Sequence, residues 1–124
     1  MVNIAQGRPI WDLAAIQSAV VAGQFALVNR LARRNVQNLD WKIETLSGFL
    51  LALKSQHYQK SYQSQGAYDG RKLLDVDAYK MNFNEKDCCE GSSAHICVWS
   101  KLCLETLPSG DHVAVVTLHL DGLL

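Results

Sequence analysis

Three basic side chains and a tryptophan between residues 60 and 119 have the types and spacing to act on an anionic ligand. Lys60 follows an apolar segment within the polar, tyrosine-containing run Gln56–Tyr62. Trp99 and Lys101 are two residues apart in one alternating segment, and His119 lies in the next. Histidine has an ordinary pKa of about 6.5, which suits proton transfer near neutral pH. These residues therefore predict a cationic, aromatic binding surface.

A central helix is expected to hold Lys60 in place. The i, i+3, i+4, i+7 spacing of a helix with one buried face is met by Leu46, Phe49, Leu50 and Leu53. Asp40 is placed to cap the N-terminus of this helix. Because Lys60 comes just after the apolar stripe, its main chain is anchored while its ammonium group reaches water. This arrangement suits a charge that meets an anion at a fixed position.

Two further helices are predicted upstream, after an irregular lead-in over residues 1–11. Asp12 is placed to cap the first helix, and Gly23 to end it. The second helix is expected from about Phe25 to Arg34. Its basic surface consists of three arginines at i, i+3 and i+4, namely Arg30, Arg33 and Arg34. This surface is either simply solvated or, through Arg33, a contact to phosphate.

The rest of the chain has the period of two that is typical of strands. Residues His95–Glu105 and Val113–Leu120 alternate clearly, with a hairpin signal between them. Within Leu73–Phe83 the apolar positions change parity, which predicts a bulge or a break between two short strands. Two polar segments, Gln63–Arg71 and Asn84–Ala94, are expected to form a loop and a connection.

Helices followed by antiparallel strands predict an α+β fold, with the N-terminal helices packed on one face of a C-terminal antiparallel sheet. The 124 residues are expected to form a single domain (1–124), helical over 12–60 and a sheet over 72–121. If the aliphatic positions face the helices, Trp99, Lys101 and His119 stand on the open face, and Lys60 enters from the rim.

The composition is that of an ordinary soluble domain, with 48 % hydrophobic and 19 % charged residues. No run approaches the roughly 18 apolar residues of a membrane span, so a cytoplasmic protein with no membrane partner is expected.

The zero net charge hides an uneven distribution of charge along the chain. Residues 1–84 hold ten Lys and Arg against six Asp and Glu, a net +4, and residues 85–124 hold two against six, a net −4. The overall charge is weak for a nucleic-acid binder.

The four cysteines fit neither a disulfide framework nor a CxxC pair. The cluster that raises the question of zinc contains Cys88, Cys89, His95 and Cys97. Structural zinc sites usually pair ligands two to four residues apart in two separate knuckles, so reduced thiols, no metal and no cofactor are expected. A nucleophilic Cys97 or Cys103 is a weak alternative, because no glycine-rich elbow or helix N-terminus lies near to lower its pKa.

Several short motifs occur in an order that resembles the MqsR-type mRNA interferases, the toxins of bacterial toxin–antitoxin pairs. They are AGQ at 22–24, NLDW at 38–41, HYQKS at 57–61, VWSK at 98–101 and VTLHL at 116–120. The resemblance covers roughly residues 12–121 and implies a RelE-like fold. It also implies a metal-independent endoribonuclease, a hydrolase that cleaves mRNA either at the ribosome or free of it, and a cognate antitoxin protein as partner.

The resemblance also implies roles for individual residues. The family's essential lysine falls on Lys60, the lysine of its aromatic strand on Lys101, and its C-terminal lysine on His119. Its active-site tyrosine falls on Trp99, which can stack on a base but has no hydroxyl group to donate. The 2′-OH attack on the adjacent phosphorus needs a base, an acid and positive charge. His119 would move the proton, Lys60 with Lys101 would stabilise the phosphate, and Tyr58 or Tyr62 would stack a base.

A second function remains open. The same fold could belong to a non-catalytic interaction protein that binds a protein partner through its open sheet face. The exchange of tyrosine for Trp99 and the weak net charge favour this alternative. A homodimer is compatible with either function.

Overall fold

A computed structural model of the chain describes residues 3–4, 8–27, 40–65, 73–91, 96–106 and 112–120. The helices are α1 (Leu13–Val21) and α3 (Ile43–Ala52), and a 3-10 turn follows at Ser55–His57. The strands are β1 (Asn3–Ile4), β2 (Phe25–Leu27), β3 (Tyr58–Gln65), β4 (Leu73–Asn84), β5 (Cys89–Glu90), β6 (Ile96–Thr106) and β7 (His112–Leu120). Within these ranges the strands form one sheet in the order β1-β3-β4-β6-β7-β2, and β5 pairs with β4.

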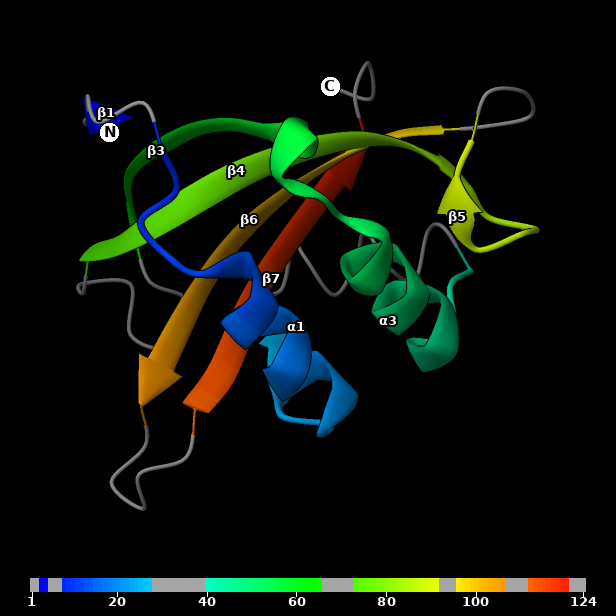
Figure 1. The fold of residues 1–124 in the computed structure, drawn as a ribbon, viewed down its shortest axis with the longest axis horizontal. Helices are drawn as coiled ribbons and strands as arrows, with labels where there is room; N and C mark the ends of the chain where they lie inside the picture. The colour runs from blue at the N-terminus through cyan, green and yellow to red at the C-terminus, as the bar shows by residue number, and fades with distance from the viewer. Residues whose placement is uncertain are drawn as a thin grey trace.

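The predicted α+β class is confirmed, since both helices precede the four long antiparallel strands β3, β4, β6 and β7. Helices α1 and α3 lie on one face of the sheet (Figure 1). None of the helices within the described ranges is long and apolar enough to cross a membrane.

The main core lies between the two helices and the sheet. The four apolar residues predicted for the buried stripe of the central helix, Leu46, Phe49, Leu50 and Leu53, are all buried. Trp41 and Phe49 meet Phe83 of β4, and the ring centroids of Phe49 and Phe83 are 5.3 Å apart at an interplanar angle of 89°. Edge-to-face contacts of this kind add to the free energy of burial. The central helix is therefore fixed to the sheet through aromatic packing.

Helix α1 has the predicted ends. The side chain of Asp12 accepts a hydrogen bond from the main-chain N–H of Ala14 at 3.2 Å. At the other end Gly23 has φ +76°, a left-handed conformation that costs glycine little.

The predicted cap of the central helix is wrong. Asp40 lies in a turn with φ +55°, and the N-cap position of α3 belongs to Lys42. The side chain between them, Trp41, is buried in the core, so the chain must turn inward before the helix can begin.

The predicted second helix is wrong at its start, because Phe25–Leu27 forms β2, parallel to β7. These three residues pair with Ala114–Val116 of β7, so their backbone groups bond to the sheet rather than along a helix. The rest of that predicted helix, including Arg33, lies outside the described residues.

The predicted boundary between the helical part and the sheet is also wrong. Strand β3 begins at Tyr58 and includes Lys60, and the first residues of the predicted loop, Gln63–Gln65, continue it. The strand lies between β1 and β4. Main-chain pairing on both sides therefore compensates for the low β-propensity of its polar sequence.

The bulge or break predicted in Leu73–Phe83 is wrong as well, because β4 is one continuous strand. The parity of the apolar positions changes because the first part of β4 buries residues on one face of the sheet and the second part buries residues on the other face. Tyr79, Met81 and Phe83 pack under the helices, whereas Val76 and Ala78 belong to a second cluster on the opposite face. An irregularity occurs instead in β3, where Tyr58 and Lys60 pair with the consecutive residues Tyr79 and Ala78.

A buried carboxylate joins the lead-in to the sheet. Asp77 of β4 is fully buried and accepts hydrogen bonds from the main-chain N–H groups of Ile10 at 2.9 Å and Trp11 at 2.8 Å. The hydroxyl group of Ser61 in β3 donates a third bond, at 2.6 Å. These bonds fix the segment that leads into α1.

A second polar contact joins the end of α3 to β5. The main-chain N–H of Lys54 donates to Nδ1 of His57 at 2.8 Å, so Nε2 carries the ring proton and donates to Glu90 Oε2 at 2.7 Å. This hydrogen bond is the largest cause of the lowered pKa of Glu90. Desolvation opposes it, and the charges of His57 and Lys54 each lower the pKa by a smaller amount.

Replacing Asp77 by asparagine is expected to lower the free energy of unfolding by about 1.5–3 kcal/mol. An amide offers one oxygen where two N–H donors approach different carboxylate oxygens, so one donor loses its partner. Urea denaturation measures the change. The control is Asp75→Asn, an exposed position on the same strand, for which a change within about 0.5 kcal/mol is expected. Equal effects of the two variants would contradict this role of Asp77.

The Glu90 contact predicts a pH dependence of stability. Because the pKa of Glu90 is lowered in the folded state, its contribution is fully present above the ordinary value near 4.5 and is lost as pH falls through the lowered value. The Glu90→Gln variant should therefore lose less stability than the wild type between pH 6 and about pH 3, a range set by the ordinary carboxyl pKa. Urea denaturation across this range tests it. The control is Glu44→Gln in α3, which should follow the wild-type curve.

Candidate functional site

The pairing of the strands brings two of the predicted lysines into one row across the sheet. Lys60 of β3 is opposite Ala78 of β4, and Ala78 is opposite Lys101 of β6. The row continues from Lys101 to Thr117 of β7. Directly opposed residues share a face of the sheet. Lys60 and Lys101 therefore stand on the same face two strand spacings apart, about 10 Å between Cα atoms.

A second row lies two residues further along β4. It joins Lys80 to Trp99 of β6, and Trp99 to His119 of β7. The two rows are about 7 Å apart. The Nζ atom of Lys80 is 5.3 Å from the ring centroid of Trp99, a cation–π contact. The structure describes the main chain of His119, and its pairing with Trp99 puts this position in the same row.

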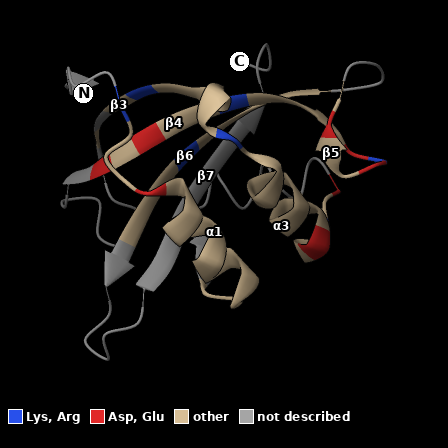
Figure 2. Cartoon of the chain, viewed as in Figure 1, with Lys and Arg blue, Asp and Glu red and all other residues tan. Residues whose placement is uncertain are grey.

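These two rows form what we call the lysine face, the side of the sheet opposite α1 and α3 that carries Lys60, Lys80, Trp99 and Lys101. Among the residues whose side chains the structure describes, the charged ones on this side of the sheet are the three lysines. Lys60 is exposed, and the other three side chains are half-buried. Figure 2 shows basic positions on β3, β4 and β6. The zero net charge of the chain thus coexists with a local concentration of positive charge.

The irregularity in β3 determines which side Lys60 occupies. In a regular strand Tyr58 and Lys60 would share a face. The extra residue between them reverses the alternation. Lys60 therefore joins the lysine face instead of the helix side, and it does so within a strand rather than at the rim.

The same irregularity separates Tyr58 from the other predicted site residues. Its ring contacts that of Tyr79 on the helix side, with centroids 5.8 Å apart. Its hydroxyl group bonds to Ser61 at 2.5 Å and donates to the main-chain oxygen of Arg8 at 3.1 Å. Tyr58 is therefore a structural residue of the helix side. Tyr62 is opposite Val76, in the same alternation as Lys60, and its side chain lies outside the described residues.

Lys80 is a site residue that the sequence analysis missed. The signal was present, because its neighbours Tyr79 and Met81 alternate toward the core and so require Lys80 to point to the other face. The change of parity before Tyr79 predicts a break in the strand, however, and a break leaves the face of Lys80 undetermined.

The described part of the chain contains no group of three or more His, Cys, Asp or Glu side chains that could hold a metal ion. All four cysteines are thiols, with Cys88 and Cys89 exposed. His95, the fourth member of the cluster considered for zinc, lies outside the described residues.

The lysine face can neutralise an anion, offer an aromatic surface and bring one histidine position near the positive charge. A scan against protein-family models finds no match to this chain, and a search of curated proteins finds no relative. The resemblance to the MqsR-type mRNA interferases therefore rests on the sequence motifs, and the chemistry must be argued from the lysine face itself.

Proposed function

We propose that this protein is the toxin of a toxin–antitoxin pair and acts as a metal-independent endoribonuclease on mRNA, with a cognate antitoxin protein as its partner. The observation that carries the proposal is the strand register, which aligns Lys60 with Lys101 and, in the adjacent row, Trp99 with His119. These residues are far apart in the sequence and fall on one face of one sheet, as a catalytic surface requires.

Binding follows from the chemistry of this face. Proteins hold single-stranded nucleic acid through a positively charged surface that follows the backbone and aromatic side chains that stack on bases. Lys60, Lys80 and Lys101 would supply the charge, and Trp99 would supply the stacking surface. Such stacking is worth about 1–3 kcal/mol per base.

Cleavage requires a proton acceptor beside this charge. In the proposed step the ribose 2′-oxygen attacks the adjacent phosphorus, and its proton passes to the imidazole of His119. The bond from phosphorus to the 5′-oxygen breaks, and this oxygen takes a proton from the ammonium group of Lys101. Lys60 stabilises the added negative charge on the phosphoryl oxygens. The products are a 2′,3′-cyclic phosphate and a free 5′-hydroxyl.

One observation favours the alternative, an interaction protein that binds a protein partner through the same face. The ammonium group of Lys80 already lies over the ring of Trp99. A base would have to stack on the other side of the ring or displace Lys80. An acidic protein surface would instead meet the lysines without needing the ring.

Induced expression tests the proposed cleavage. The wild type should arrest growth with decay of RNA, and Lys60→Ala or His119→Ala should each slow cleavage by about a hundredfold or more, the usual effect of losing a proton-transfer or charge-stabilising group. The control is Lys86→Ala, an exposed lysine in the turn between β4 and β5, which should cleave like the wild type. Decay that survives both site substitutions would mean that the site lies elsewhere. Intact RNA in wild-type cells would favour the interaction protein.

The salt dependence of RNA binding tests the lysine face independently of cleavage. For single strands the slope of log K against log salt concentration is about −0.7 per neutralised phosphate. Lys80→Ala and Lys101→Ala should each make the slope shallower by about 0.7, as measured by fluorescence anisotropy with a labelled oligoribonucleotide. Lys86→Ala should leave it unchanged. Equal slopes for all four proteins would exclude phosphate contacts by the lysine face.

A further inference from the structure

The indole ring of Trp99, which is the aromatic part of the lysine face, is already in contact with a cation. The Nζ atom of Lys80 lies over this ring, 5.3 Å from its centroid. The two residues are directly opposite each other on β4 and β6, and both side chains are half-buried. The strand register therefore builds this cation–π contact into the sheet.

The sheet covers another part of the same indole. Trp99 packs against a buried cluster of three residues on this side of the sheet, namely Val76, Ala78 and Cys103. Within the neighbouring row Ala78 lies between Lys60 and Lys101. A ligand that reaches Trp99 therefore meets a ring that the sheet partly covers and that Lys80 already contacts.

A neutral aromatic ligand and an anionic one gain differently from this ring. To stack where the ammonium group of Lys80 lies, either ligand must displace it, and the loss of a lysine–indole contact lowers affinity by about two- to fivefold. A neutral ligand gives the ammonium group no new partner. A phosphate accepts a charge-assisted hydrogen bond from it, and such a bond raises affinity by about tenfold or more. The contact therefore disfavours neutral rings and gives way to a phosphate.

In a nucleotide the base and the phosphate are joined through one sugar, so a base on Trp99 brings a phosphate within reach of the lysines around the ring. We propose that Lys80 determines the ligand specificity of the lysine face. Its ammonium group leaves the ring for the phosphate of the bound strand, so Trp99 selects a base that a charged phosphate accompanies. This proposal rests on the RNA binding proposed above, and it excludes neutral aromatic molecules as preferred ligands.

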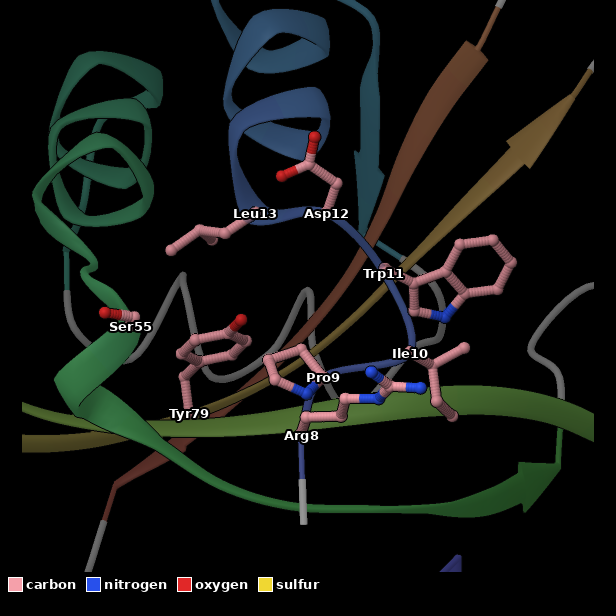
Figure 3. Close-up of a pocket in the computed structure, with 8 residues that line it drawn as sticks. All are labelled: Arg8, Pro9, Ile10, Trp11, Asp12, Leu13, Ser55 and Tyr79. Atoms are coloured by element: carbon pink, nitrogen blue, oxygen red, sulfur yellow. The ribbon is translucent and has the colours of Figure 1, made fainter. Parts of the chain in front are cut away.

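The other two tryptophans allow changes at Trp99 to be measured separately. Trp41 is buried in the main core under the helices. Trp11 lies just before α1, where it lines a cavity together with Tyr79 (Figure 3), and its indole N–H donates to the main-chain oxygen of Asp75 at 2.7 Å. The indole signal of Trp41 is therefore the control for direct contact with the lysine face.

Titration with two dinucleotides, followed by ¹H–¹⁵N NMR of the ¹⁵N-labelled full chain, tests the proposal. The probes are the deoxyadenosine dinucleotide, with its single phosphodiester, and its uncharged methylphosphonate analogue. Neither probe has a 2′-hydroxyl group, so the proposed cleavage cannot act on them. The indole signal of Trp99, identified by its loss in Trp99→Phe, should shift in a saturable way with the charged dinucleotide, and the signal of Trp41 should not. The uncharged analogue should bind at least about tenfold more weakly.

Substitution of Lys80 should change the two affinities in opposite directions. Lys80→Ala uncovers the ring and removes a phosphate contact. The uncharged dinucleotide should therefore bind about two- to fivefold more tightly, and the charged one at least about twofold more weakly. Lys80→Arg keeps a cation that stacks on aromatic rings, so it should keep the preference of the wild type for the charged dinucleotide.

Two further lysine variants are the controls for this reversal. Lys101→Ala removes a charge from the same face but leaves Lys80 on the ring, so it should weaken the charged dinucleotide alone. Lys86→Ala, in the exposed turn between β4 and β5, should change neither affinity.

The proposal is overturned if the uncharged dinucleotide binds equally to the wild type and to Lys80→Ala, or if Lys101→Ala strengthens its binding as much as Lys80→Ala does. An absence of a saturable Trp99 shift with the charged dinucleotide would also overturn it. Cleavage is measured separately, by induced expression of Lys60→Ala and His119→Ala. The specificity of the lysine face and the proposed ribonuclease can therefore fail independently.

Discussion

The buried carboxylate of Asp77 is the interaction on which the arrangement of the other elements depends. A charge that is removed from water must be fully hydrogen-bonded to be tolerated. Here the bonds come from two segments distant in sequence, the main chain of Ile10 and Trp11 and the hydroxyl group of Ser61. The carboxylate therefore fixes the lead-in against β4 and, through it, the start of α1. It also selects one register between β3 and β4, because Ser61 is directly opposite Asp77.

Local features of the fold could be predicted from the sequence because their causes lie within a few residues. The cap at Asp12 and the helix end at Gly23 depend on side-chain chemistry and backbone freedom at single positions. The alternation of β6 likewise put Trp99 and Lys101 on one face without knowledge of the neighbouring strands. Such features depend on short-range interactions that a sequence displays directly.

Other features could not be predicted because they depend on pairing between distant segments. Phe25–Leu27 has the composition of a helix start, and its pairing with β7 overrides that preference. Lys60 reaches the lysine face through an irregularity that becomes visible once β3 is aligned with β4. Proximity to Lys60 in the sequence predicts that Tyr58 belongs to the site, but the same irregularity turns Tyr58 to the other side of the sheet. Sequence proximity is a poor guide to position wherever a strand changes its alternation.

The register of β4 links the two sides of the sheet. Lys80 belongs to the lysine face, and its neighbour Tyr79 is buried in the core beneath the helices, so the backbone of β4 determines both positions. A slip of one residue would exchange these faces, putting a lysine into the aromatic core and a tyrosine among the cations. Asp77 opposes such a slip, because its carboxylate would leave the N–H groups of Ile10 and Trp11 without their acceptor. The buried charge thus costs desolvation free energy, and it helps to determine which residues the sheet presents on each side.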